Sequence, residues 1–400
     1  MNKKEISKNE KIEACIMLSS FFDTVGFHNG KWEFKGNIHA FDLNQVNVLV
    51  LTLIQQFYVL GGPNHMSIKL LNASDDTILF LATLRTVNKG GGELNYIDEY
   101  LKIFNLLIDP SKFRGIGYQT YKSLEHLKKL RKISKSSKKT FMEDLKKEKT
   151  MGGNGAAIRT AVIGIKWHNN IDKVIEESII ASRITHNYAL GFLGGLVSAL
   201  FTNYAYNGIK PWLWIDNLLN LYENNNIKNY INSTDLKDIY NDEIDKYFYY
   251  WYKYKEKRFD SVITNRLDKN IMNPIENTLF FAQLIEEREK KIKNKEISYN
   301  SIASSGADSV IYAYDALLLS IVPEPDFTIN LNNPTYSFES LIFFGCIHIG
   351  DTDSTGAILG AWYGALNGYT GMGGKERIKD LEFYNELLEE SNLLIKSLKL

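Results

Sequence analysis

Two acidic clusters, far apart in the chain, each stand at the start of an apolar run that is rich in small residues. The first is SDDT at residues 74–77, and the second is DTDST at residues 351–355. Asp and Ser are preferred at helix N-termini, where backbone N–H groups lack partners within the helix, so each cluster predicts the beginning of a helix. If the two helices lie side by side in one core, four carboxylates converge and repel one another unless cations offset their charge.

This pattern indicates a metal site with oxygen ligands. Carboxylate and hydroxyl oxygens suit Mg²⁺ or Mn²⁺ rather than zinc, because neither cluster contains Cys and only His348 lies nearby. The alternative interpretation is that the clusters cap two unrelated helices. The spacing by itself does not separate the two interpretations.

Glycines recur every fourth residue in the run after the second cluster, at Gly356, Gly360, Gly364 and Gly368. Each glycine on a helix face lowers helix stability by about 1 kcal/mol relative to Ala, which is hard to explain unless another backbone lies very close. We therefore predict that this helix is central and tightly packed.

A second run, residues 184–209, contains 26 residues without a formal charge. Its length fits a membrane span, but His186, several Asn and Thr residues and repeated glycines interrupt it. Small residues are again spaced by four, at Gly191, Gly195 and Ala199. The run predicts a helix buried in the protein rather than in a membrane.

Helical patterns dominate the whole chain, and strand-like alternation is scarce. We predict an all-α protein, a single orthogonal helical bundle over residues 1–400 whose core is supplied by both ends of the chain. Residues 127–150 are rich in lysine and predict an exposed insertion. A nucleic-acid contact there is less favoured, because the segment has almost no aromatic side chains on which bases could stack.

Charge and cysteine content narrow the function classes. Lys plus Arg and Asp plus Glu are 47 each, which gives no electrostatic reason to expect nucleic acid or an anionic membrane as the main partner. The two cysteines lie in apolar stretches without zinc-site spacing, and the N-terminus is charged and lacks an apolar signal region. These features predict a cytoplasmic protein with reduced thiols.

Two further stretches carry candidate functional residues. Glu33 stands between Trp32 and Phe34, where partial desolvation would raise its pKa and suit proton transfer; the alternative is a solvated surface residue. The turn GGNGAAIR at residues 152–159 would let backbone N–H groups approach phosphates. It is neither GxGxxG nor a Walker motif, so a tight helix entry is the alternative.

Taken together, these motifs resemble the ADP-ribosylglycohydrolase family, also called ADP-ribosyl hydrolases, and most closely its ADP-ribosylarginine hydrolase branch. The likeness runs over nearly the whole chain, from about residue 12 to the last helix. The resembling blocks are GKWEF at 30–34, SDDT at 74–77, GGNGAAIR at 152–159, THNYALGFLGGLVSALFTNYA at 185–205, IYAYDALL at 311–318, DTDST at 351–355 and LEFYNELLEE at 381–390.

The resemblance implies an all-α fold with two Mg²⁺ or Mn²⁺ ions. The metal ligands that it implies are Ser74, Asp75, Asp76, Asp351, Asp353 and Ser354. The residues that it implies for substrate binding are Asn154, Gly155, Ala156, His186 and Asp308. Asp308 lies in the small and apolar stretch 306–320, at an N-cap-like position ahead of a helix. The catalytic candidates for accepting a proton from water are Asp75, Asp76 and Glu33, unresolved among themselves.

The implied reaction is hydrolysis of the N-glycosidic bond between ADP-ribose and a protein arginine, by a monomer that releases ADP-ribose. This chain departs from the branch after His186, where Asn187 and the three residues that follow replace a stretch that commonly begins His-Pro-Thr. Serine-linked or small-molecule ADP-ribose conjugates are therefore an alternative. A non-catalytic ADP-ribose-binding relative is another, although it would have little reason to keep all four costly acids.

Overall fold

The computed structural model describes residues 6–35, 43–133, 145, 151–237, 241–259, 274–291, 301–322 and 334–398. Within these ranges the protein is helical, apart from one antiparallel pair of two-residue strands, β1 (Ile321–Val322) and β2 (Thr335–Tyr336). The predicted all-α class is confirmed. Most of the predicted lysine-rich insertion lies outside the described residues.

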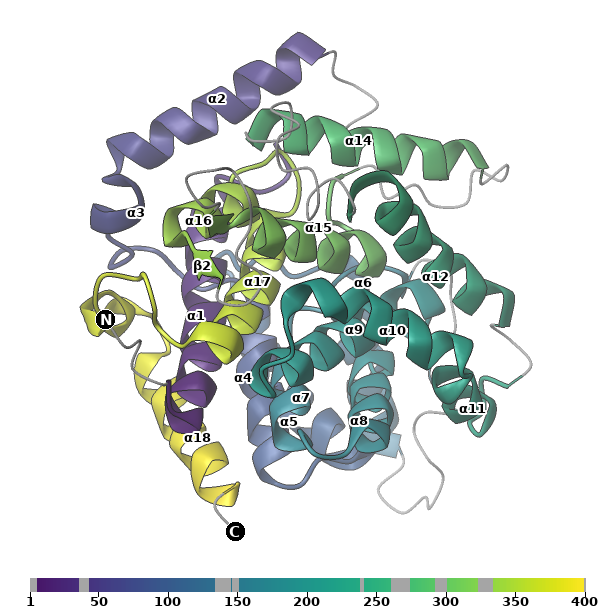
Figure 1. Ribbon diagram of the computed structural model, residues 1–400. Coiled ribbons are helices and arrows are strands. Elements are labelled where there is room, and N and C mark those ends of the chain that lie inside the picture. Colours follow the sequence, from purple (N-terminus) through teal and green to yellow (C-terminus); the bar gives the residue numbers. More distant parts are fainter. Residues whose placement is uncertain are drawn as a thin grey trace.

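The centre of the molecule is a pair of helices from opposite ends of the chain. Helix α1 (Lys8–Phe27) lies along α17 (Thr352–Asn367), as Figure 1 shows. From Ala14 to Phe27 every residue of α1 is buried, because three further helices also pack around it, α4 (Asp75–Asn88), α16 (Phe338–Cys346) and α18 (Tyr384–Ser397). Both chain ends therefore contribute to the core, as predicted.

Glycines let α17 approach α1 closely. A Cβ built on Gly360 would lie 2.3 Å from the carbonyl oxygen of Leu18, and one on Gly364 would lie 2.3 Å from that of Ala14. Gly356 faces the carbonyl oxygen of Phe22 in the same way, at 2.7 Å. The predicted close backbone packing is thus confirmed for these three glycines.

The fourth glycine of the repeat has a different role. Gly368 lies beyond the last helical residue as the C-cap of α17, with φ 58° and ψ −137°. Its predicted place on the packed helix face was wrong. The glycine repeat extends past the end of the helix, because a helix end with positive φ also favours glycine.

Helix α9 (Ala189–Tyr206) occupies the other half of the core. It is the one helix among the described residues that is long and apolar enough to cross a membrane, and 94% of it is buried inside the protein. It packs against α7 (Ala161–Lys166), α8 (Ile171–Arg183) and α15 (Gly306–Leu319). Such burial is the environment predicted for a core helix.

The remaining helices cover this core. In Figure 1, α2 and α14 lie together along one edge and α18 lies beside α1 and α4. The further elements are η1 (His28–Gly30), α2 (Leu43–Val59), α3 (Gly62–His65), α4 (Asp75–Asn88), α5 (Glu93–Leu107), α6 (Tyr118–Ile133), η4 (Pro211–Leu213), α10 (Trp214–Glu223), α11 (Asn226–Asn232), α12 (Asn241–Tyr254), the π-helix η5 (Lys255–Phe259), α14 (Pro274–Lys291), α16 (Phe338–Cys346), η7 (Lys375–Asp380) and α18 (Tyr384–Ser397).

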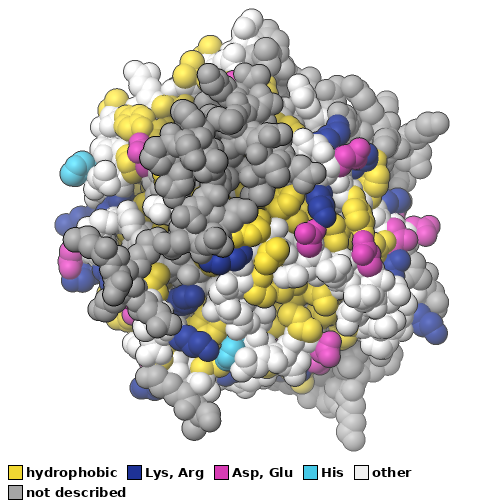
Figure 2. Space-filling view, in the orientation of Figure 1, with side chains coloured by type: hydrophobic (Ala, Val, Ile, Leu, Met, Phe, Trp, Pro, Cys, Tyr) yellow, Lys and Arg dark blue, Asp and Glu magenta, His cyan; other side chains and the backbone are white. Residues whose placement is uncertain are grey.

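Charged side chains of both signs are interspersed on the surface. Figure 2 shows Lys and Arg among Asp and Glu over one face, and the described residues of that face form no extended region of a single sign. This distribution matches the balanced composition of the sequence. It gives the described part of this face no basic stripe of the kind that tracks a nucleic-acid backbone.

Substitution of Gly360 by Ala tests the packing of α17 on α1. At an open helix position the change would stabilise the protein by about 1 kcal/mol. Here the added methyl group meets the backbone of α1 at 2.3 Å. We therefore expect a net loss of about 1–3 kcal/mol in the free energy of unfolding, measured by urea denaturation.

The matched control for this substitution is Gly117→Ala, where the nearest atom in reach of the new Cβ is 4.0 Å away. We expect that variant to unfold within about 0.5 kcal/mol of the wild type. Equal stability of the Gly360→Ala variant and the wild type would contradict the close approach of the two helices.

Candidate metal centre

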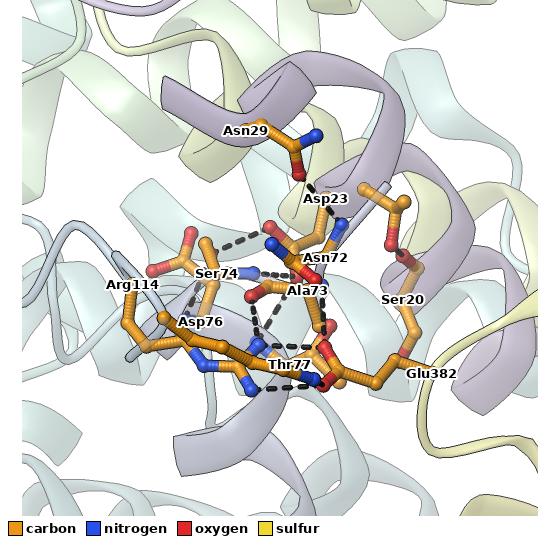
Figure 3. Close-up of polar contacts among 12 residues, drawn as sticks. Ser20, Asp23, Asn29, Asn72, Ala73, Ser74, Asp76, Thr77, Arg114 and Glu382 are labelled. Carbon is orange, nitrogen blue, oxygen red and sulfur yellow. Dashed lines mark hydrogen bonds and ion pairs between the residues drawn. The ribbon is translucent and has the colours of Figure 1, made fainter. Parts of the chain in front are cut away.

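A buried carboxylate near the C-terminal end of α1 forms the floor of the site. Asp23 accepts a hydrogen bond from the Ser74 hydroxyl at 2.6 Å, and its second oxygen accepts from the backbone N–H groups of Ser74 and Thr77, each at 3.3 Å, and from the Thr77 hydroxyl (Figure 3). These donors fix the side chain of Asp23 beneath the start of α4. Asp23 was not predicted as a site residue, although it is the one formally charged residue between Glu13 and Lys31.

The two acidic clusters meet above this floor. Ser74 caps α4 and Asp351 caps α17, so both clusters are helix N-termini, as predicted. Five acidic residues form two sets of three that share Asp353, and within each set the carboxylate oxygens lie within 4.8 Å of one another. One set is Asp23, Asp76 and Asp353, and the other is Glu33, Asp351 and Asp353. The predicted convergence of the two helices is confirmed.

We call these five residues, Asp23, Glu33, Asp76, Asp351 and Asp353, the carboxylate cluster. None of them is more than 9% exposed. Among the described residues, no Lys, Arg or His forms an ion pair with any of them. The cluster is therefore a buried concentration of negative charge, which is the donor set that hard divalent cations require.

Burial and mutual repulsion raise the pKa values within the cluster. Burial is the larger cause for Asp76 and Asp353, whose pKa values lie well above the usual range, and the neighbouring Asp75 and Glu33 respectively raise them further. Burial, followed by the charge of Asp351, raises the pKa of Glu33 to about 8. Burial raises the pKa of Asp23 to about 6, against the opposing effect of its hydrogen-bond donors.

The remaining predicted ligands lie beside the cluster. The Ser354 hydroxyl donates to an Asp76 oxygen at 3.0 Å, and the Ser74 hydroxyl accepts from the Asp76 backbone at 3.0 Å. Asp75 belongs to neither set of three carboxylates, and its backbone N–H donates to the Arg114 carbonyl at 2.8 Å. That Ser74, Asp75, Asp76, Asp351, Asp353 and Ser354 hold a metal ion stays a prediction.

A short turn after α1 brings Glu33 to the cluster. His28, Asn29 and Phe34 all have positive φ, at 45°, 57° and 51°. The buried Trp32 ring stacks on His28 with centroids 4.5 Å apart, and the Phe34 backbone N–H donates to the Gly350 carbonyl at 2.7 Å. The turn is thereby tied to the residue before Asp351, so Glu33 points at the second cluster rather than into solvent.

The glycine-rich turn borders the cluster from the other side. The Asn154 amide donates to an Asp351 oxygen and to the Ala303 carbonyl, each at 2.8 Å. Gly155 follows it, and a Cβ there would lie 2.7 Å from Cε1 of His186. Ala156 is fully buried beneath the turn. The structure thus brings the predicted residues of this turn together with His186 and the carboxylates.

His186 presents a defined nitrogen to this turn. Its Nδ1 lies 2.8 Å from the Thr185 hydroxyl, which accepts a hydrogen bond from Arg159 at 2.6 Å. The Thr185 proton is then available for Nδ1, which assigns the imidazole proton to Nε2, on the side of Gly153. Burial, with Arg159 adding to it, lowers the pKa of His186 to about 3, so the ring is neutral.

Asp308 lies in the first turn of α15 and is not its cap. Ser305 is the N-cap and accepts from the Asp308 backbone N–H at 3.1 Å, while its hydroxyl donates to Asp308 Oδ2 at 2.7 Å. The predicted N-cap-like position was wrong, because a serine three residues earlier takes that role. A backbone bridge from Gly153 to Ser305 keeps Asp308 next to the glycine-rich turn.

Glu382 joins the site to the C-terminal part of the chain. Its carboxylate accepts hydrogen bonds from Arg114 at 2.6 and 2.9 Å, from Lys112 at 2.5 Å and from the Ala73 backbone at 3.1 Å (Figure 3). Arg114 also donates to the Ala73 carbonyl at 2.7 Å. We call this arrangement the Glu382 clamp; it fixes the residue next to Ser74 and the loop that holds Asp75.

A cavity of about 370 Å³ lies next to the glycine-rich turn. Met151, the residue before the turn, forms part of its wall, and so does Ser123, whose hydroxyl donates to the Thr185 carbonyl at 3.0 Å. Most of the rest of the lining comes from α6 and includes Tyr118, Lys122 and His126, and Leu145 completes it. The cavity is therefore adjacent to the predicted substrate-binding residues.

Comparison with known proteins identifies relatives of the whole chain. The ADP-ribosylglycohydrolase family matches residues 5–397. A putative ADP-ribosyl glycohydrolase L444 of Acanthamoeba polyphaga mimivirus is 31% identical over 392 residues, covering 93% of this chain and 67% of that protein. ADP-ribosylhydrolase ARH1 of Dictyostelium discoideum is 29% identical over 377 residues, covering 91% and 88%.

A solved structure shows the same fold. The structure described as an ADP-ribosylglycohydrolase-related protein complex aligns with a TM-score of 0.51 over 97% of this chain and 99% of that one. At 14% sequence identity the likeness concerns the fold alone.

Replacement of Glu382 by Gln tests the clamp through its pH dependence. Burial raises the pKa of Glu382, but hydrogen bonds from Arg114 and Lys112 outweigh it and lower the pKa from 4.5 to about 2. A carboxylate whose folded-state pKa is depressed stabilises the fold above its unfolded pKa. We expect the wild type to exceed the variant by about 1–3 kcal/mol in unfolding free energy at pH 7.

That difference should shrink as the pH falls from 4.5 towards 2, as measured by urea denaturation at several pH values. Glu376→Gln is the control, because Glu376 is 83% exposed and pairs only across one helical turn with Lys379. A change below about 0.5 kcal/mol is expected for it. A pH-independent difference for Glu382→Gln would argue against the clamp.

Proposed function

We propose, from the premise that this chain belongs to the ADP-ribosylglycohydrolase family, that it hydrolyses the bond between ADP-ribose and an arginine side chain of a modified protein. The observation that carries the proposal is the carboxylate cluster, two sets of three buried acids that share Asp353. The resemblance of the sequence to the arginine-specific branch supports the choice of bond. ADP-ribose is the expected product.

The cluster fits two Mg²⁺ or Mn²⁺ ions. Asp23, Asp76 and Asp353 would hold one ion, and Glu33 and Asp351, again with Asp353, would hold the other. The donor set is all oxygen, and without positive charge these buried acids repel one another. The ions would supply positive charge that attracts the ribose hydroxyl groups and water to this end of the cleft.

Asp75 is the best placed of the three catalytic candidates to accept the proton of the attacking water. Glu33 and Asp76 are members of the two sets, whereas Asp75 is not. Its carboxylate faces Glu33 across Gly115, since a Cβ on that glycine would lie 3.7 Å from Asp75 Oδ1 and 3.5 Å from Glu33 Oε1. Asp75 thus lies close to Glu33 without being a member of either set of three.

The proposed reaction is a single substitution at the anomeric carbon of the ribose. The water oxygen bonds to that carbon while the bond to the guanidine nitrogen breaks, through an oxocarbenium-like state. Asp75 takes the proton that the water loses, and the substrate guanidinium departs as neutral guanidine with the electron pair of the broken bond. The guanidine then takes up one proton from solvent, and Asp75 releases its proton to solvent. ADP-ribose and unmodified arginine result, so atoms and charges balance.

The rest of ADP-ribose fits along the glycine-rich turn. Backbone N–H groups of this turn and the Nε2–H of His186 are donors for the pyrophosphate oxygens. The cavity beyond Met151, about 370 Å³, is of a size to receive the adenosine end. Asp308, held by Ser305 at the start of α15, lies beside the same turn.

Serine-linked or small conjugates remain the second candidate function, because residues 187–190 depart from the arginine branch. In the structure Asn187 accepts a hydrogen bond from Arg183 at 2.8 Å, and the Tyr188 hydroxyl donates to Glu243 of α12 at 2.5 Å. These two side chains thus serve the packing of α8 and α12. The departure is therefore a weaker argument for a change of substrate than it is in the sequence.

Release of free ADP-ribose from two synthetic peptides tests the proposal, one peptide modified on arginine and one on serine. With added Mg²⁺ we expect release from the arginine peptide and at least tenfold slower release from the serine peptide. EDTA should abolish both rates. Release from the serine peptide alone would overturn the arginine assignment, and tight ADP-ribose binding without release from either would favour a non-catalytic relative.

Substitution of individual acids separates ion binding from proton transfer. Asp76→Asn removes a member of the cluster, so we expect weaker Mn²⁺ binding by calorimetry and loss of turnover together. Asp75→Asn should lower kcat by about 10²- to 10⁴-fold, the usual contribution of a general base, while Mn²⁺ affinity stays within about threefold. Helicity of both variants should match the wild type by circular dichroism.

An Asp75→Asn variant that loses Mn²⁺ affinity as severely as Asp76→Asn would assign Asp75 to the ion ligands and not to proton transfer. Full activity of either variant would refute the mechanism.

A further inference from the structure

Two exposed phenylalanines stand beside the carboxylate cluster. Phe34 is 52% exposed and Phe113 is 67% exposed. Single apolar side chains on a protein surface are common, so their exposure alone assigns nothing to them. Their attachment and their neighbours are what distinguish them.

The Phe113 ring is held firmly although it is exposed. One face stacks on Phe27, with centroids 5.9 Å apart and ring planes 19° from parallel. Its neighbours in sequence, Lys112 and Arg114, both donate to Glu382 in the clamp. The ring is thus fixed from below and from both sides along the chain, and an immobile ring loses little entropy when a ligand contacts it.

Phe113 lies near two carboxylates. A Cβ built on Gly30 would lie 2.7 Å from Cε1 of Phe113 and 3.7 Å from Oε1 of Glu33. A Cβ on Gly115 would lie near the same Glu33 oxygen and near Asp75, at 3.5 and 3.7 Å. Both glycines have positive φ, 76° and 75°, where a side chain would be strained, so no side chain at position 30 or 115 separates the Phe113 ring from the carboxylates.

Phe34 is placed by a backbone conformation that bulky residues rarely adopt. Its φ is 51°, and its N–H donates to the Gly350 carbonyl at 2.7 Å. This hydrogen bond holds the turn against the residue that precedes Asp351. Glu33 is therefore directed inward while the next side chain remains on the surface at the mouth of the site.

An exposed ring beside carboxylates is a receptor for a planar cation. A guanidinium group stacks on an aromatic face, and carboxylates accept its N–H donors. We infer that Phe113, with Phe34, forms an aromatic rim that binds the guanidinium group of the modified arginine at the scissile bond. The inference rests on the proposed function and identifies specificity-determining residues for it, since a serine adduct has no cation to place there.

The test compares catalysis with binding of a product that lacks the guanidinium. For Phe113→Ala we expect kcat/KM on the arginine-linked peptide to fall about five- to thirtyfold, the range of a partly desolvated cation–aromatic contact. Inhibition by free ADP-ribose should stay within about twofold of the wild type. Phe113→Leu should lose as much as Phe113→Ala, and Phe113→Tyr should retain wild-type kcat/KM.

Phe34→Ala should also lower kcat/KM, but by less than Phe113→Ala does. The reason is that Phe34 is held only by the turn after α1, whereas Phe113 also stacks on Phe27. The control is Leu94→Ala, a 50% exposed apolar residue at the start of α5, for which no kinetic change is expected. Circular dichroism of every variant should show wild-type helicity, and Phe113→Ala should unfold thermally within a few degrees of the wild type, because it loses only the stacking contact with Phe27.

The outcomes separate this inference from the proposed function. A wild type without activity on the arginine peptide overturns both. An active wild type with a Phe113→Ala variant within twofold of it overturns the rim alone, and so does a parallel loss of ADP-ribose inhibition in that variant. A Phe34→Ala variant with unchanged kcat/KM removes Phe34 from the rim.

Discussion

Repulsion among buried carboxylates is the constraint that the surrounding structure has to satisfy. Asp23, Glu33, Asp76, Asp351 and Asp353 lie close together, each at most 9% exposed. In such a medium like charges interact far more strongly than in water. The protein offsets part of this with hydrogen-bond donors, from Ser74 and Thr77 to Asp23, from Ser354 to Asp76 and from Asn154 to Asp351. No described cationic side chain does so, and this is why a divalent ion fits the site.

The parts of the site that the sequence predicted are those encoded locally. SDDT and DTDST were predicted as helix N-termini because capping depends on residues one to three positions apart, and both caps are present. The approach of α17 to α1 was predicted because glycines at Gly356, Gly360 and Gly364 have no other use in a helix interior. Two predictions from local pattern were wrong. Gly368 continues the spacing of four but is itself the C-cap of α17, and Asp308 is not the N-cap of α15 because Ser305 takes that role.

The parts that were missed depend on contacts between segments far apart in the chain. Asp23 is an isolated acid in an apolar helix, and only the docking of α4 supplies the donors that give it a role. Neither Phe113 nor Glu382 was singled out as a site residue from the sequence. Their placement depends on the clamp, in which Arg114 and Glu382 meet although they are 268 residues apart along the chain. Glu33 was singled out by its aromatic neighbours, but its contact with Asp351 needs the positive-φ turn that follows α1.

Ion binding and folding are coupled in such a site because the ligands come from elements that the fold brings together. Asp23 belongs to α1, Asp76 to α4 and Asp353 to α17, so the unfolded chain offers no comparable site. An ion that binds only the folded state stabilises it by about 2.7 kcal/mol when its concentration is 100 times the dissociation constant. The glycine contacts between α1 and α17 set the distance from Asp23 to Asp353. In the proposed site, helix packing remote from the substrate would therefore determine the affinity for the ions, and through it the reaction that they would support.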